Sequence, residues 1–250
     1  MISILMPVYN TDPQLLERSI ESCLHQSCLA DYEVVIVNNG STNLKTCQIL
    51  DGYGTNAKVR ILECPQQENK RNISVALNFG IKNIINPFIA RMDSDDIMMR
   101  DRLKTQLEYM QDNPNIAVLG SQIKTLFAGQ VSQLPLLITP QNAITAKWNW
   151  FISHPSVMIR AAVFEEVGLY DEDTIVQPED LELWFRILQK GLRMENLPEV
   201  LLSYNDHQKG LSIVDSKDPE WDQNIEKIRY KFRRDRASVG DFLDISSRMR

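Results

Sequence analysis

The chain has 250 residues, of which 43% are hydrophobic and 24% are charged, an ordinary composition for a globular protein with a substantial core. Its 27 basic and 33 acidic residues leave a net charge of −6, which argues against a general nucleic-acid-binding protein. The sequence contains no apolar run of the roughly 20 residues that span a bilayer. The four cysteines form no Cys-x-x-Cys pair, so we expect reduced thiols and a cytosolic compartment.

Strands and helices alternate through the first 121 residues. The first apolar run stops at Pro7 and has no basic stretch before it, so we interpret it as a strand and not as a signal peptide. Strands are expected where aliphatic and β-branched residues run together, as in parallel strands covered on both faces: residues 2–9, 32–37, 59–62, 88–92 and 116–121. Helices are expected where apolar residues recur every three or four positions: residues 13–27, 44–53, 73–85 and 103–110. This alternation predicts an α/β fold with a mostly parallel central sheet and helices on both faces.

The second half of the chain is less regular. We expect a hairpin around Ala128-Gly129 and a short helix that contains Trp148, Trp150 and Phe151. Short strands are expected over residues 156–159 and 200–204. Between them, Pro178-Glu179-Asp180 opens a helix with an apolar face, and Gly191 is the residue that ends it.

The C-terminal tail is basic. Residues 227–236 carry six basic residues and one acidic residue, interleaved with Ile228, Tyr230 and Phe232. We interpret this segment as a solvated helix at the end of the chain. The alternative is a docking surface for an anionic membrane, which would make the protein peripheral to that membrane.

The most informative stretch is Asp93-Ser94-Asp95-Asp96, which ends the apolar run of residues 88–92. In an open α/β sheet, ligands bind at the carboxyl ends of the strands. Three carboxylates this close repel one another unless a cation or hydrogen-bond donors compensate them. Taken alone, the stretch is also compatible with a solvated turn that starts the next helix, because Asp is common in both. The other motifs of the chain favour a ligand site.

Six motifs, in their order along the chain, resemble those of family 2 glycosyltransferases, which have the GT-A fold. They are Pro7-Val8-Tyr9-Asn10, the segment 33–42 that ends in Asn38-Asn39-Gly40-Ser41-Thr42, the segment 74–81, Asp93-Ser94-Asp95-Asp96, the segment 154–160 and the segment 179–184. The resemblance covers roughly residues 1–215. It implies a nucleotide-sugar half over residues 1–100 and an acceptor half over residues 101–215, followed by a basic helical tail over residues 216–250.

The resemblance also implies roles for individual residues. The residues expected to bind the nucleotide sugar are Pro7, Tyr9, Asn10, Asn39, Arg71, Asp93 and Ser94. Asp95 and His207 are expected to hold a divalent cation, Mn²⁺ or Mg²⁺, which stabilises the departing diphosphate. Asp180 is the expected general base, with Glu179 beside it in the site, because an anion is favoured in the first turn of a helix. For Asp96, a functional role and a role as cap of the next helix are both open.

Three departures from the family pattern bear on the substrate. Asn38-Asn39 stands where relatives commonly have two aspartates. An Asn amide can still accept a hydrogen bond from uracil, so uracil is the first choice of base, although the change leaves other bases open. Asn72 stands where many relatives have glycine. The chain also lacks the Gln-x-x-Arg-Trp element of processive members, which favours transfer of one sugar per encounter.

These expectations combine into one predicted function. The chain is expected to be a metal-dependent inverting glycosyltransferase that moves one sugar from a nucleoside-diphosphate sugar, UDP-sugar as first choice, to a hydroxyl of a glycan or glycoconjugate. One alternative is a catalytically silent subunit that binds sugar nucleotides. A second is a sugar-1-phosphate nucleotidyltransferase, but the glycine-rich basic loop that such enzymes carry after the first strand is missing from residues 7–12.

Overall fold

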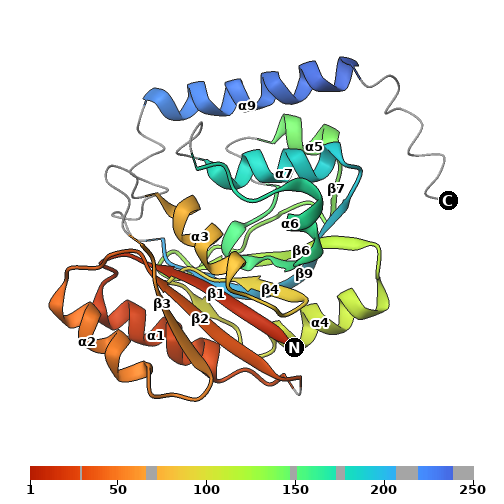
Figure 1. Ribbon diagram of the computed structural model, residues 1–250. Helices are drawn as coiled ribbons and strands as arrows, with labels where there is room; N and C mark the ends of the chain where they lie inside the picture. Colours follow the sequence, from red (N-terminus) through yellow and green to blue (C-terminus); the bar gives the residue numbers. More distant parts are fainter. Residues whose placement is uncertain (29, 66–71, 147–150, 173–177, 207–218, 239–250) are drawn as a thin grey trace.

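The structure, a computed structural model, describes residues 1–28, 30–65, 72–146, 151–172, 178–206 and 219–238 (Figure 1). The strands are β1 Ile2–Val8, β2 Tyr32–Asn38, β3 Val59–Glu63, β4 Phe88–Arg91, β5 Ile97–Met98, β6 Ile116–Thr125, β7 Leu137–Ile138, β8 Met158–Arg160 and β9 Arg193–Tyr204. The α-helices are α1 Pro13–Leu24, α2 Leu44–Tyr53, α3 Ile73–Lys82, α4 Arg102–Asp112, α5 Pro140–Thr145, α6 Ala162–Val167, α7 Glu179–Gln189 and α9 Pro219–Ser238.

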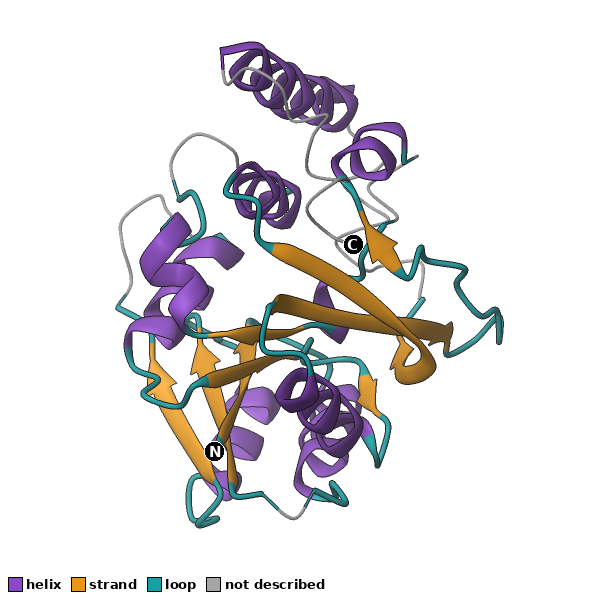
Figure 2. Cartoon of the chain, turned by 90° about the vertical axis from the view of Figure 1, so that its right-hand side faces the viewer, coloured by secondary structure: helices purple, strands orange, loops and turns teal. Residues whose placement is uncertain are grey.

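All these strands belong to one sheet in the order β3-β2-β1-β4-β8-β6-β9-β5, and β7 pairs with β9. β1 to β4 are mutually parallel, β8 runs antiparallel to both β4 and β6, and β6 runs parallel to β9. The carboxyl ends of β1, β2, β4, β6 and β9 therefore lie at the same edge of the sheet (Figure 2). The predicted α/β fold with a mostly parallel central sheet is confirmed.

Helices cover both faces of the sheet, as the sequence predicted (Figure 1). Side chains alternate along β1, so that Ile4 and Met6 join a core with α1, α2 and α4, whereas Leu5 joins a second core with α3 and α7. α3 lies so close to β1 that a Cβ atom at Gly80 would collide with the side chains of Leu5 and Val37. These two cores hold the carboxyl ends of the strands in fixed positions.

The predicted helix ends are partly right. Asp12 caps α1 by accepting hydrogen bonds from the backbone N–H groups of Gln14 and Leu15, at 2.9 and 3.2 Å. Gly191 has a φ of 74°, the left-handed conformation expected just beyond the end of α7. The prediction for residues 73–85 was too long, because α3 ends at Lys82 and Ile85 is 94% exposed. The side chain of Asn83 binds the carbonyl of Phe79 at 2.8 Å and so satisfies part of the end of that helix.

The second half shows larger differences from the prediction. The hairpin at Gly129 is confirmed, with Thr125 N donating to Gln130 O at 2.8 Å. Trp148 and Trp150 lie outside the described residues, and Phe151 is buried in a turn and not in a helix. The last strand begins at residue 193 and not at residue 200, because β9 continues through a bulge at Pro198, where its pairing with β6 shifts register. The short elements β7 and α6 were not predicted, and neither was β5 in the first half of the chain.

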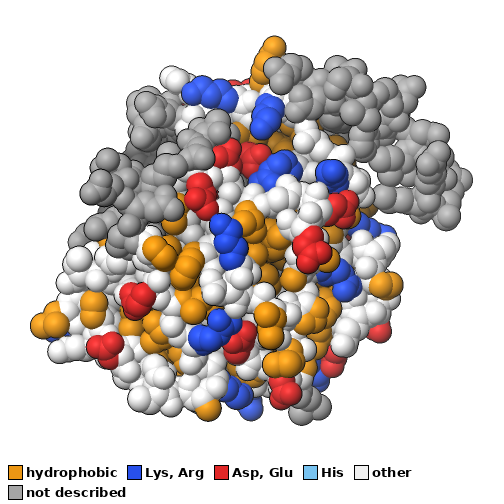
Figure 3. Space-filling model, viewed as in Figure 1, with side chains coloured by type: hydrophobic (Ala, Val, Ile, Leu, Met, Phe, Trp, Pro, Cys, Tyr) orange, Lys and Arg blue, Asp and Glu red, His pale blue; other side chains and the backbone are white. Residues whose placement is uncertain are grey.

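The helix α9 is packed on the domain and is not a free solvated tail. Its Ile225, Ile228 and Phe232 are buried, and the Phe232 ring stacks on Phe185 of α7 with 4.4 Å between centroids. The outer side of the helix presents Tyr230, which is 67% exposed. On the face shown in Figure 3, basic and acidic side chains are interspersed. None of the described helices is long and apolar enough to cross a bilayer.

Candidate active site

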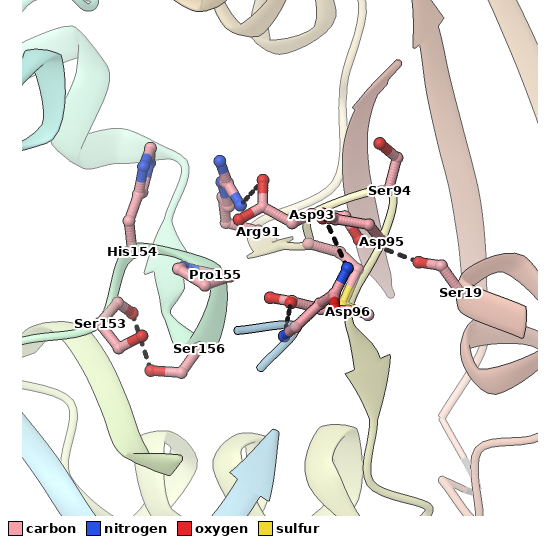
Figure 4. A network of polar contacts seen from close by, with 12 residues as sticks. Ser19, Arg91, Asp93, Ser94, Asp95, Asp96, Ser153, His154, Pro155 and Ser156 are labelled. Atoms are coloured by element: carbon pink, nitrogen blue, oxygen red, sulfur yellow. Dashed lines mark hydrogen bonds and ion pairs between the residues drawn. The ribbon is translucent and has the colours of Figure 1, made fainter. Parts of the chain in front are cut away.

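The acidic motif lies in the loop that follows β4, at the edge where the carboxyl ends of the strands meet (Figure 4). Arg91, the last residue of β4, is buried and forms an ion pair with the half-buried Asp93. Helix α1 supports the loop from the other side, because Ser19 Oγ donates to the backbone oxygen of Asp93 at 2.9 Å. The Ser94 hydroxyl, which is buried, lies 2.6 Å from the hydroxyl of Thr11. These contacts tie the loop to β4, to α1 and to the segment before α1.

Asp95 and Asp96 are both held by Asn205, the residue after β9. The backbone N–H of Asn205 donates to Asp96 Oδ1 at 2.7 Å, and its amide Nδ2 donates to Asp95 Oδ2 at 3.2 Å. Asp96 is 1% exposed, and burial together with the charges of Asp93 and Asp95 raises the pKa of its carboxyl well above the usual range. The N-cap residue of α4 is Asp101, so the alternative that Asp96 caps this helix is wrong.

The acidic motif fits a divalent cation as one part of a larger ligand set. Oxygen ligands suit Mg²⁺ and Mn²⁺, and Asp96 Oδ2 is buried without a hydrogen-bond partner among the described residues. No group of three or more Asp, Glu, His or Cys side chains in the described part of the chain could hold a metal by itself. Further ligands would come from the phosphates of a donor and from His207, which lies outside the described residues.

The predicted base-binding residues lie beside this motif, at the ends of β1 and β2. Tyr9 is 47% exposed and can offer its ring to a base, and Pro7 is half-buried. Asn39 is 8% exposed, and its amide donates to the backbone oxygen of Asn72 at 3.3 Å. Asn72 itself caps α3 by accepting from Val75 N at 2.9 Å, which gives this departure from the family pattern a structural role.

Asn10 has a structural function that the sequence did not reveal. It adopts a φ of 49°, and its Oδ1 accepts from the backbone N–H groups of Thr42 and Asn43 at 2.7 and 2.8 Å. These bonds join the loop after β1 to the loop after β2. Arg71, the remaining residue predicted to bind the donor, lies outside the described residues.

The predicted catalytic acids begin α7. Asp180 is half-buried and accepts from Leu181 N at 2.8 Å. Burial raises the pKa of Asp180, and the neighbouring Glu179 carboxylate raises it further. Glu179 is 7% exposed, and burial raises the pKa of its carboxyl to about 7, with the positive charge of Arg91 acting in the opposite direction. Both acids are therefore less acidic than free carboxyls, a property that suits proton transfer near neutral pH.

A buried histidine and tyrosine support Glu179. His154 Nδ1 lies 3.5 Å from Glu179 Oε1, and His154 Nε2 lies 2.8 Å from Tyr170 Oη. Burial lowers the pKa of His154 to about 3, with the charge of Arg91 acting in the same direction, so the imidazole is neutral and its contact with Glu179 is not an ion pair. Tyr170 is fixed in turn by Asn78, whose Oδ1 accepts from Tyr170 N at 2.9 Å.

Arg91 connects the acidic motif with the catalytic acids. Figure 4 shows its guanidinium between His154 and Asp93. The charge of Arg91 acts on the pKa of both Glu179 and Asp180 while its side chain pairs with Asp93. Arg91 was not among the residues that we expected in the site, although a charged residue inside an otherwise apolar strand was an available signal. Tyr170 and Asn205 gave no such signal.

The fold and this site define a glycosyltransferase, and comparison with known proteins identifies the family. Residues 3–168 match the pattern of the family described as Glycosyl transferase family 2, so the chain belongs to this family. It is 30% identical over 205 residues to the amylovoran biosynthesis glycosyltransferase AmsE of Erwinia amylovora, a match that covers 81% of this chain and 75% of AmsE.

Solved structures share the fold. The chain resembles S. aureus TarS 1-349 in complex with UDP-GlcNAc, with a TM-score of 0.69 at 18% identity, over 85% of this chain and 60% of TarS 1-349. It also resembles the mannosyltransferase PcManGT from Pyrobaculum calidifontis in complex with GDP-Man and Mn²⁺, with a TM-score of 0.64 at 16% identity, over 84% of this chain and 58% of that one. The predicted GT-A fold is therefore confirmed, whereas substrates do not follow from a likeness at this level of identity.

Proposed function

We propose that the protein is a metal-dependent, inverting glycosyltransferase that transfers one sugar from a UDP-sugar to a hydroxyl of a glycan or glycoconjugate. The observation that carries the proposal is that Arg91 pairs with Asp93 of the acidic motif while its charge also acts on Glu179 and Asp180, so the acids of α7 lie near that motif. A donor whose phosphates lie against the acidic motif would direct its sugar toward Asp180. The amylovoran enzyme supports a role in polysaccharide biosynthesis, and TarS with UDP-GlcNAc supports a uridine nucleotide.

In this proposal the residues of the acidic motif bind and orient the donor. Ser94 and Asp93 are held in place by Thr11, Ser19 and Arg91, so they can bind ribose hydroxyls without reorganising. A divalent cation bound at Asp95 supplies positive charge for the departing diphosphate. PcManGT, whose complex holds Mn²⁺ with GDP-Man, supports this use of a cation. The residues that carry the cation are Asp95 and His207.

Asp180 acts as the general base. Its carboxylate accepts the proton of the acceptor hydroxyl while that oxygen attacks the anomeric carbon from the face opposite the diphosphate. Glu179 is less suited to this step, because it is 7% exposed and lies against the neutral His154, whereas Asp180 is half-buried. Glu182 is excluded as a partner of Asp180, because its carboxylate pairs with Arg186 at 2.7 Å. One base opposite the leaving group inverts the configuration of the anomeric carbon.

The alternative of peripheral membrane contact is confined to the outer side of α9. Ile225, Ile228 and Phe232 are buried in the domain and are not available for insertion into lipid. Lys227 and Lys231 are exposed, so any contact would be electrostatic and would weaken as salt is added.

The proposal is tested by calorimetry with UDP, GDP, CDP and TDP, each with and without Mn²⁺, followed by incubation with UDP-sugars. Tight binding of UDP only with the cation, and slow hydrolysis of a UDP-sugar, are the expected results. A silent subunit that binds sugar nucleotides would bind UDP without hydrolysing the donor. A nucleotidyltransferase would instead form a nucleotide sugar from a sugar 1-phosphate and a nucleoside triphosphate. Preference for GDP would contradict the choice of uracil.

A further inference from the structure

One residue far along the chain donates hydrogen bonds to two members of the acidic motif. Asn205 is 4% exposed and follows β9 directly. Its amide Nδ2 donates to Oδ2 of Asp95 at 3.2 Å, over a separation of 110 positions in the sequence. Its backbone N–H donates to Oδ1 of Asp96 at 2.7 Å. The two bonds use different parts of the residue, so a change of side chain removes one bond and leaves the other.

The orientation of the amide follows from its neighbours. With the amide turned over, Oδ1 of Asn205 would face the carboxylate of Asp95, and two acceptors would repel each other. The bond from Nδ2 therefore fixes one oxygen of Asp95 and limits the rotation of the carboxylate about its last torsion. Because the N–H group also directs positive charge at the anion, it offsets part of the repulsion between Asp95 and Asp96.

We propose that Asn205 is a positioning residue that orients the Asp95 carboxylate for the divalent cation. This inference rests on the proposed function, in which Asp95 carries that cation. Groups that hydrogen-bond to metal ligands fix the direction of the ligand atoms, and their loss typically weakens metal binding 10- to 100-fold. Asn205 acts through Asp95 and is not itself a catalytic residue.

The chain offers a closely matched control at the opposite edge of the sheet. Asn86 is also 4% exposed, and its Nδ2 donates to Oε1 of Glu33 at 3.1 Å, compared with 3.2 Å for Asn205 and Asp95. Its other partner is Ser3 Oγ, at 2.9 Å, near the start of β1. Asn205→Ala and Asn86→Ala therefore remove equally buried amides that donate to carboxylates, but only the first contacts the acidic motif.

The experiment measures the Mn²⁺ affinity of the full chain in saturating UDP, from the electron paramagnetic resonance signal of free Mn²⁺, together with the melting temperature. We expect Asn205→Ala to bind Mn²⁺ about 10- to 100-fold more weakly than the wild type and Asn86→Ala to bind it as the wild type does. Asn205→Ser keeps a hydroxyl donor and should give an intermediate affinity. This variant takes the place of Asn205→Ala in the comparison if the alanine variant does not fold.

The outcomes separate this inference from the proposed function. Wild-type affinity in Asn205→Ala, or in Asn205→Ser if the alanine variant does not fold, overturns the positioning role alone. Equal weakening in the Asn205 and Asn86 variants, in step with their melting temperatures, also overturns it, because loss of stability then explains the effect. A wild-type chain that binds no Mn²⁺ in the presence of UDP overturns the proposed metal dependence, and the role of Asn205 fails with it.

Discussion

Glu179 should make the folded protein less stable as the pH rises, and Glu179→Gln should remove this effect. The carboxyl is 7% exposed, and burial raises its pKa from 4.5 to about 7. Between these two pH values the unfolded chain releases the proton of Glu179 while the folded chain retains it. The unfolded state therefore binds fewer protons, and the free energy of unfolding falls with increasing pH over this window. A neutral glutamine of nearly the same shape has no such dependence.

The magnitude follows from the raised pKa. One pH unit corresponds to about 1.4 kcal/mol, so a rise from 4.5 to about 7 corresponds to a loss of about 3 kcal/mol between pH 4.5 and pH 8. The free energy of unfolding of Glu179→Gln, relative to the wild type, should increase by about this amount across the window. His154 is present in both proteins, so its own titration largely cancels in the difference.

Urea unfolding at pH 4.5, 6 and 8, with chelator and without nucleotide, measures this difference. Glu182→Gln is the matched control on the same helix, because Glu182 is 5% exposed but pairs with Arg186 at 2.7 Å. Loss of that charged hydrogen bond should lower the free energy of unfolding at pH 8 by about 1–3 kcal/mol. This change is opposite in sign to the increase expected for Glu179→Gln. A Glu179→Gln difference that is the same at pH 4.5 and pH 8 would refute the argument, because burial would then not govern this carboxyl.

Three further predictions concern the proposed reaction. Asp180→Asn should lower turnover by roughly 10²- to 10⁴-fold with little change in donor affinity. The wild type should convert an α-linked donor into a β-linked product, which the anomeric proton coupling shows by NMR. An α-linked product would show that the mechanism is wrong. Asp95→Asn should abolish Mn²⁺-dependent binding of UDP in calorimetry while its melting temperature stays near that of the wild type, and full activity of this variant in chelator would exclude the metal role. Asn39→Ala should weaken binding of UDP, and unchanged affinity for UDP would move the base away from the end of β2.

Local patterns in the sequence were sufficient for the first half of the fold. Strands such as Tyr32–Asn38 contain a run of β-branched residues, Val34 to Val37, and helix starts such as Asp12-Pro13 depend only on groups a few residues apart. The same holds for the acidic motif, which is contiguous in the chain. By contrast, the second half contains short elements such as β7 and α6, whose few residues carry too little periodicity to be recognised.

The sequence by itself also determined the family and indicated the candidate acids, because both depend on residue types in a known order. Only the tertiary structure decided how the acids are supported. Arg91 meets Asp93, His154 lies between Tyr170 and Glu179, and Asn205 reaches Asp95 over 110 positions in the sequence. The contact of Asn205 arises because β5, which follows the acidic motif, pairs with β9, and the contact of Glu179 arises because α7 begins against His154. Burial in that place raises the pKa of Glu179. No pattern along the chain encodes such proximity, since it arises from packing between distant segments.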